Sequence, residues 1–231
     1  EPELKEHQIL DAIDYGAKAC DFTKRYWTLD PIDGTKGFLR GDQYAVALAL
    51  VEKGEVVLGV LGCPNLPLDN KNPKKGKGCL FAAVKGEGAV MRPLDNDEVE
   101  RIHVDSITQS ENAVFCESVE SGHSSHEEHA KIAELLRVTA SPYRIDSQCK
   151  YAAVARGDAS IYLRLMTYRS WIWDQAAGAI IVEEAGGTVT DMDGKPLDFS
   201  QGRRLQGNSG VIATNGKLHN AVIAAIRQVI E

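Results

Sequence analysis

Two apolar runs near the start of the chain constrain its fold most. Residues 44–51 alternate and are rich in Ala, Val and Leu, and residues 56–61 are apolar again after a short turn at Gly54. Alternation with a period of two predicts strands, and the glycine turn predicts that the two strands pair as an antiparallel hairpin. A sheet containing this hairpin is therefore expected in the first half of the chain.

The rest of the first half extends this pattern. Residues 4–15 show the helical spacing of apolar side chains, residues 79–91 predict a second hairpin, and residues 101–104 predict the last strand of a meander. Residues 65–78 contain four lysines together with Pro and Asn, which predicts a solvated loop. The first half is thus expected to be one helix followed by an antiparallel sheet.

After residue 110 the predicted secondary structure changes from hairpins to alternating strands and helices. Strands are predicted over residues 113–119, 143–145, 160–165, 188–190 and 210–213, and helices from about residue 124 and over 148–156, 173–184 and 217–229. Such alternation is typical of an α/β layer. We therefore expect an α/β (α+β layered) fold in two parts, residues 1–110 and residues 111–231.

Composition excludes several classes of function. The net charge of −7 argues against binding to a nucleic acid polymer or to an anionic membrane surface. No run reaches the roughly 18 apolar residues of a membrane helix. The five cysteines are scattered without metal-ligand spacing, which predicts free thiols and a reducing compartment such as the cytoplasm.

The segment "LDPIDGTKGF" raises the question of why Asp30 and Asp33 stand beside apolar residues. One interpretation is a turn, because Asp-Pro and Asp-Gly are common turn dipeptides. The other is a divalent-metal site, in which both carboxylates and the Ile32 carbonyl converge as the hard oxygen ligands that suit Mg²⁺. Thr35 follows at the predicted start of a short helix, where its hydroxyl and the local N–H groups would suit an anion.

A further acid is needed for a metal site, and Asp174 in "WDQAAGAIIVEEAGG" is the best candidate. At the start of an apolar helix, this aspartate could simply cap the helix and favour its dipole. Taken together with the upstream segment, however, the pattern favours a metal ligand.

These two segments resemble the two signatures of the inositol monophosphatase-like, lithium-sensitive, Mg²⁺-dependent phosphatases. Further stretches resemble the 3'(2'),5'-bisphosphate nucleotidases of that family, and more closely the fungal and plant enzymes; they are "GVLGCPNLPL", "GHSSH", "DSQCKYAAVARGDASIYLRL" and "PLDFSQGRRL". The resemblance runs from about Ile9 to the end of the chain. It implies an alternating α-β-α-β-α sandwich like that of inositol monophosphatase and fructose bisphosphatase, in which residues 1–110 are the remainder of a metal-binding domain.

The resemblance also implies a reaction. Asp30 would bridge two Mg²⁺ ions, the Ile32 carbonyl would bind one of them, Asp33 and Asp174 would hold the other, and Thr35 would orient and help to activate the attacking water. The substrate would be 3'-phosphoadenosine 5'-phosphate, which loses its 3'-phosphate to give AMP; its sulfated form and inositol 1,4-bisphosphate are further implied substrates. The family link would place the protein in sulfur assimilation and salt tolerance, with lithium and sodium as inhibitors.

Beside Thr35, four residues match nucleotide-contacting positions of the family: His123, Ser147, Lys150 and Arg164. Each has a simpler interpretation. His123 could be an ordinary loop histidine, Ser147 the cap of the next helix, and Lys150 a solvated helix lysine. Arg164 ends an apolar strand, so it is expected to have an anionic partner. The charged stretch 127–137 is interpreted as a solvated helix face.

The chain departs from the family pattern in two ways. Family members carry a longer segment before "DPIDGT", which supplies a metal-binding glutamate, a second acid and the helices over the first sheet. We therefore expect a truncated chain with an incomplete first helical layer and an exposed sheet face, and its activity is open. Gln175 also stands where the nucleotidases usually have histidine, and the segment from Arg164 to Asp174 is short. An inositol or sugar phosphatase and a non-catalytic nucleotide-binding module remain alternatives.

Overall fold

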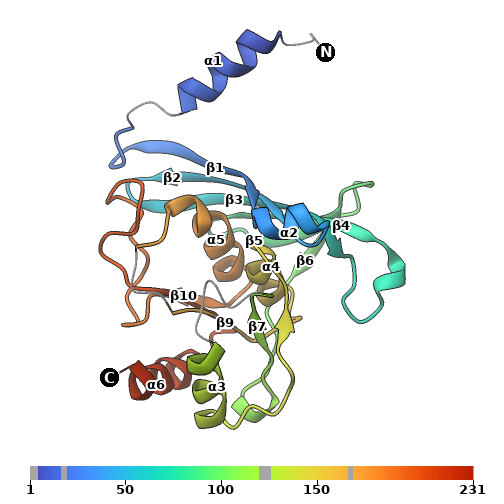
Figure 1. Cartoon of the computed structure of the whole chain (residues 1–231), viewed down its shortest axis with the longest axis vertical. Coiled ribbons are helices and arrows are strands. Elements are labelled where there is room, and N and C mark those ends of the chain that lie inside the picture. Colours follow the sequence, from blue (N-terminus) through green and yellow to red (C-terminus); the bar gives the residue numbers. More distant parts are fainter. Residues whose placement is uncertain (1–4, 17–19, 120–125, 166–168, 231) are drawn as a thin grey trace.

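The computed structural model describes residues 5–16, 20–119, 126–165 and 169–230, and within them the chain forms two sheets separated by helices (Figure 1). The first sheet is antiparallel throughout, and its strands lie in chain order: β1 (Arg25–Asp33), β2 (Ala45–Glu52), β3 (Glu55–Pro67), β4 (Lys77–Val84), β5 (Gly88–Pro93) and β6 (Glu100–Ile102). The predicted meander is confirmed. It includes one strand, β1, that carries the acidic segment itself.

The second sheet has the order β10-β11-β9-β7-β8 and is mixed. Its strands are β7 (Phe115–Glu117), β8 (Tyr143–Arg144), β9 (Ile161–Arg164), β10 (Thr188–Thr190) and β11 (Val211–Thr214). Strand β7 runs parallel to both β8 and β9, whereas β9, β11 and β10 pair antiparallel. This is the strand–helix alternation that the second half of the sequence predicts.

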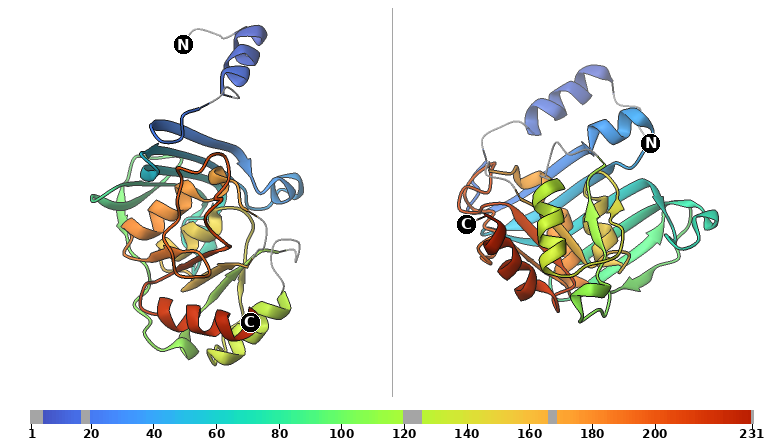
Figure 2. Two further views of the ribbon diagram at one scale, coloured as in Figure 1. Left: turned by 90° about the vertical axis from the view of Figure 1, so that its left-hand side faces the viewer. Right: turned by 60° about the horizontal axis from the view of Figure 1, so that its bottom comes forward.

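Two helices fill the space between the sheets. Helix α4 (Cys149–Ala155) is buried at every residue, and α5 (Ala176–Glu184) is buried from Ala176 to Val182. An apolar sequence on all sides of a helix is what a position between two sheets requires, because no face meets water. Helices α3 (His126–Leu135) and α6 (His219–Ile230) contact each other on the far side of the second sheet (Figure 2). The layers therefore alternate as the sequence predicts, and the predicted fold class is confirmed.

The outer face of the first sheet is exposed and apolar. Trp27 and Leu29 of β1 are 57% and 53% exposed, in line with the alternating burial of that strand. Helix α1 (Glu6–Gly16) lies on this side and stands away from the sheet in Figure 1 and in the left view of Figure 2, with no buried residue. The expected exposed sheet face is thus present in the described part of the chain.

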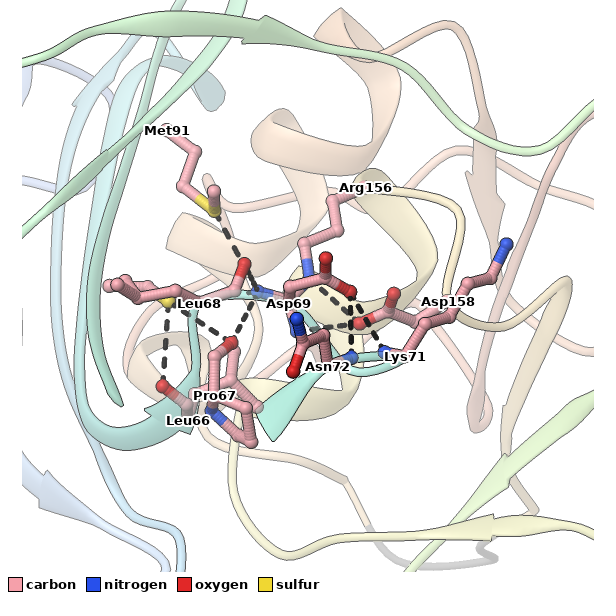
Figure 3. A network of polar contacts seen from close by, with 10 residues as sticks. Leu66, Pro67, Leu68, Asp69, Lys71, Asn72, Met91, Arg156 and Asp158 are labelled. Carbon is pink, nitrogen blue, oxygen red and sulfur yellow. Dashed lines mark hydrogen bonds and ion pairs between the residues drawn. The ribbon is translucent and has the colours of Figure 1, made fainter. Parts of the chain in front are cut away.

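Arg156 joins the end of α4 to the first sheet (Figure 3). Its Nη1 donates to the Pro67 carbonyl at the end of β3 (2.8 Å), and its Nε donates to Asp158 Oδ2 (2.7 Å). Both charged side chains are largely buried, so each depends on the other for compensation. The hydrogen bond to Pro67 therefore links the C-terminal end of α4 to the sheet that carries the acidic segment, and the ion pair with Asp158 compensates the buried charge of Arg156.

Two predicted boundaries and one predicted exposure are wrong. Strand β3 continues to Pro67, into the predicted loop, because β4 pairs with it as far as Lys77. The helix predicted from Trp173 begins at Ala176, after a 3₁₀ turn over Ile172–Asp174. His129 lies in the stretch assigned to a solvated face but is only 2% exposed. The division at residue 110 stays a prediction.

No helix within the described ranges combines the length and the apolar character that crossing a bilayer requires. All five cysteines are free, and four of them are buried.

Candidate active site

An irregularity in β1 turns Asp30 and Asp33 toward one side. Successive side chains of a strand alternate between faces, so residues three apart should point in opposite directions. The pairing of β1 with β2 shifts between Asp30, opposite Ala47, and Asp33, opposite Ala45. The Asp30 carboxylate accepts the Ile32 N–H at 3.1 Å within this bulge. A bulge re-aims a side chain, which here allows both acids to face the same site.

Gly34 ends the acidic segment in a conformation that favours glycine. Its φ is 82°, in the left-handed region, and a Cβ atom at this position would lie 2.7 Å from the Cβ of Ser147. The short helix α2 (Thr35–Arg40) begins directly afterwards, as predicted. Thr35 Oγ1 donates to the Ile32 carbonyl at 3.3 Å. The segment is therefore packed tightly against the residues that precede α4.

Asp174 completes a cluster of three acids. One carboxylate oxygen from each of Asp30, Asp33 and Asp174 lies within 4.8 Å of the other two. Asp174 belongs to the 3₁₀ turn rather than to α5, whose N-cap residue Gln175 makes no side-chain cap hydrogen bond. Its carboxylate pairs instead with Arg164 Nη2 at 3.2 Å. The capping interpretation of Asp174 is therefore wrong, and the expected anionic partner of Arg164 is confirmed.

The electrostatics of the cluster fit a cation. Burial raises the pKa of Asp30 and of Asp174, and it raises the pKa of Asp33 to about 7. Lys150 opposes the rise at Asp33, whereas the neighbouring charge of Asp174 adds to it. Three oxygen donors that are costly to ionise next to one another would be stabilised by a hard divalent cation. The acidic cluster can therefore hold a metal ion.

The cluster opens into a cavity of about 310 Å³. The structure places every predicted site residue that it describes on the wall of this cavity: Asp30, Ile32, Asp33, Thr35, Ser147, Lys150, Arg164 and Asp174. His123 lies outside the described residues. One cavity thus brings together the predicted metal ligands and cations of both halves of the chain.

The two nucleotide-contact candidates on the α4 segment differ in their surroundings. Lys150 is buried, with its Nζ 5.4 Å from the centre of the Tyr162 ring, so the solvated interpretation is wrong. Ser147 has a φ of 65°, donates to the Asp146 carbonyl (2.6 Å) and accepts the Cys149 N–H (3.2 Å). A non-glycine residue in this conformation is held there by its surroundings, and such residues cluster at functional sites.

Sequence reasoning missed two residues next to Ser147. Asp146 pairs with Arg40 of α2 and accepts the Val119 N–H at 3.2 Å, so it joins three segments around the cavity. Gln148 donates its main-chain N–H to Asp33 and is 2% exposed. Both lie in the stretch "DSQCK", whose polar residues in front of a buried helix were the available signal.

Known proteins are similar to this chain in sequence and in fold. The Inositol monophosphatase family matches residues 3–231. The 3'(2'),5'-bisphosphate nucleotidase of Emericella nidulans is 47% identical over 98% of this chain and 69% of its own length, and that of Oryza sativa is 51% identical over 96% and 64%. An IMPase of Thermotoga maritima superimposes with a TM-score of 0.70 at 28% identity, over 97% of this chain and 81% of its own.

The chain thus spans about two thirds of the length of these curated relatives. The family match covers nearly the whole sequence, and the acidic cluster lies in the segments that carry the resemblance. This chain belongs to the inositol monophosphatase family.

Proposed function

We propose that this protein is a Mg²⁺-dependent phosphomonoesterase that converts 3'-phosphoadenosine 5'-phosphate and water to AMP and inorganic phosphate. One observation carries the proposal: three converging carboxylates share a cavity with Lys150 and Arg164, which can bind phosphate groups. The curated relatives support the nucleotide substrate, because those named as bisphosphate nucleotidases share about half of their aligned residues with this chain.

Asp30, Asp33, Asp174 and the Ile32 carbonyl would hold the metal. When bound, Mg²⁺ would neutralise the phosphate and lower the pKa of a water molecule. These residues fit this role because all four donors are oxygens and because burial leaves the carboxylates poorly solvated.

The chain's own side chains would bind and orient the reactants. Thr35 Oγ1, held by the Ile32 carbonyl at the edge of the cluster, would accept a hydrogen bond from the attacking water and orient it. Lys150 and Arg164 would pair with phosphate oxygens, and Ser147, together with His123, would contact the nucleotide. Positioning and charge stabilisation supply most of the acceleration in phosphoryl transfer, so no covalent phosphoenzyme is required.

The compartment and further substrates belong to the same proposal. Five free thiols support action in a reducing compartment such as the cytoplasm. A cavity of about 310 Å³ also leaves inositol 1,4-bisphosphate and the sulfated nucleotide as candidate substrates.

Phosphate release in Mg²⁺ tests this proposal. We expect release from 3'-phosphoadenosine 5'-phosphate well above that from inositol 1-phosphate, inhibition by lithium, and AMP as the product by ³¹P NMR. Equal release from both compounds would favour a general inositol or sugar phosphatase. Nucleotide binding without release would favour a non-catalytic module and contradict the proposal.

A further inference from the structure

We infer that Gln148 is a positioning residue for the metal site, because it ties the segment of Asp33 to the segment of Asp174 through its main chain and its side-chain amide. The inference rests on the proposed function and adds to it a residue that is not itself a metal ligand. Gln148 stands directly before α4 and lies on the wall of the active-site cavity.

The main chain of Gln148 makes the first link. Its N–H donates to Asp33 Oδ2. The conformation that directs this N–H is fixed on its N-terminal side, because Ser147 is held at a positive φ and packs against Gly34. One oxygen of Asp33 is thereby held in place, and the other remains available to a cation.

The side chain of Gln148 makes the second link, to the turn that carries Asp174. Its Nε2 donates to the carbonyl of Trp173 at 2.9 Å, one residue before Asp174. Its Oε1 accepts the N–H of Gly178 at 3.1 Å, in the first turn of α5. The amide thus binds the main-chain carbonyl of Trp173, which precedes Asp174, and the main-chain N–H of Gly178, which follows it.

The contact with Gly178 replaces a local helix cap. The first N–H groups of a helix have no partner within the helix and need an acceptor from elsewhere. Because the N-cap residue Gln175 makes no side-chain cap hydrogen bond, Gln148 supplies an acceptor from the position directly before α4. Asp174 is therefore not needed as a cap, and its carboxylate can face the cluster.

The packing between α4 and α5 leaves Gln148 little freedom. Its side chain is 2% exposed. A Cβ atom on Gly178 would lie 2.3 Å from the Tyr151 ring. The helices α4 and α5 can therefore pack this closely only because residue 178 is a glycine. The Tyr151 hydroxyl is also hydrogen-bonded to the side-chain amide of Gln175, at the start of α5. Metal sites depend on such supporting contacts, because the residues that bind the metal directly must be held within a fraction of an ångström of the required geometry.

The test compares two buried amides with matched contacts. Gln148→Met removes the amide but keeps a side chain of similar length. Asn215→Leu is the control: Asn215 is 1% exposed, and outside the cavity it donates to the Ile107 carbonyl (2.8 Å) and accepts the Leu218 N–H (3.1 Å). It also donates to Asp105 Oδ1 (2.7 Å), so its loss removes at least as many hydrogen bonds as the loss of the Gln148 amide. Mn²⁺, which prefers the same oxygen ligands as Mg²⁺, serves as the probe, and its free concentration is read by electron paramagnetic resonance.

We expect Gln148→Met to weaken Mn²⁺ binding about 10- to 100-fold, the usual effect of losing a residue that orients metal ligands. Asn215→Leu should stay within about twofold of the unaltered chain, because distant sites act independently. Circular dichroism establishes that each variant is folded. Gln148→Asn, whose shorter amide cannot keep both contacts, provides a milder variant with an intermediate loss of affinity.

Equal Mn²⁺ affinity in Gln148→Met and the unaltered chain would overturn the inference, and so would equal losses in Gln148→Met and Asn215→Leu. The Mn²⁺ measurement also distinguishes a failure of this inference from a failure of the proposed function. A chain that releases no phosphate but loses Mn²⁺ affinity only on substitution of Gln148 would refute the enzyme and uphold the positioning role. Absence of Mn²⁺ binding by the unaltered chain would overturn both.

Discussion

Replacing Asp33 by asparagine should stabilise the metal-free protein, although it should abolish the site. Asparagine keeps the shape of the side chain and an oxygen that can accept the Gln148 N–H. It removes a carboxylate whose pKa burial raises to about 7 from its ordinary 3.8. The ionised form is therefore less stable in the folded protein than in the unfolded chain.

The size of the effect follows from the two pKa values. Full ionisation of a group with this difference costs the folded state about 4 kcal/mol. Because Asp33 is partly exposed to the cavity, we reduce the expected gain to about 2 kcal/mol. The folded pKa is the higher one, so the unaltered protein loses stability as the pH rises from about 4 through 7. The advantage of Asp33→Asn should therefore be about 40% of its full size at pH 5 and nearly complete at pH 8.

Urea unfolding in the presence of a chelator measures this difference at the two pH values. Asp198→Asn is the control, since hydrogen bonds from Ser200 lower the pKa of Asp198, so the effect of its loss should not change between pH 5 and 8. Saturating Mg²⁺ should reverse the order, because a ligand stabilises only the protein that binds it. Destabilisation by Asp33→Asn in chelator, or the same gain at both pH values, would show that the buried Asp33 carboxylate does not destabilise the folded protein.

Three further predictions concern other parts of the molecule. Arg156→Met should cost about 3–5 kcal/mol in urea unfolding, because it leaves Asp158 buried without its partner; Asp158→Asn added to it should recover part of that loss, and an additive double variant would contradict this. Trp27→Lys combined with Leu29→Glu should reduce self-association in sedimentation velocity, because both side chains are exposed on the first sheet; an unchanged distribution would argue against association through this face. Thr35→Val should lower kcat about 100-fold or more without changing the melting temperature, whereas Thr35→Ser should retain most activity; equal kcat values would remove Thr35 from the mechanism.

Two parts of the site could be predicted from short stretches of sequence: the acidic segment and the need of Arg164 for an anionic partner. Asp30, Asp33 and Gly34 belong to one short segment, in which a proline, a glycine and two acids restrict the conformations available. The prediction that Arg164 needs an anion was also local, since the end of an apolar strand is a costly place for a guanidinium. Patterns of this kind can be interpreted without knowledge of what packs against them.

The contacts that sequence could not predict join residues far apart in the chain. The partners of the Gln148 amide stand 25 and 30 residues later, and its N–H reaches an acid 115 residues earlier. The burial of Lys150 likewise depends on where the second sheet lies relative to α4. Neither a glutamine in front of a helix nor a lysine in its first turn is predicted to be buried from its residue type alone, and only the tertiary arrangement places Gln148 and Lys150 on the cavity wall.

The most direct test of the account is the position of the metal. Crystals of this protein soaked with Mn²⁺ and 3'-phosphoadenosine 5'-phosphate would show the ion by anomalous scattering. We predict a peak coordinated by carboxylate oxygens of Asp30, Asp33 and Asp174, with the 3'-phosphate beside it. A peak at other residues, or none in crystals with ordered nucleotide, would contradict the claim that this acidic cluster is the catalytic metal site.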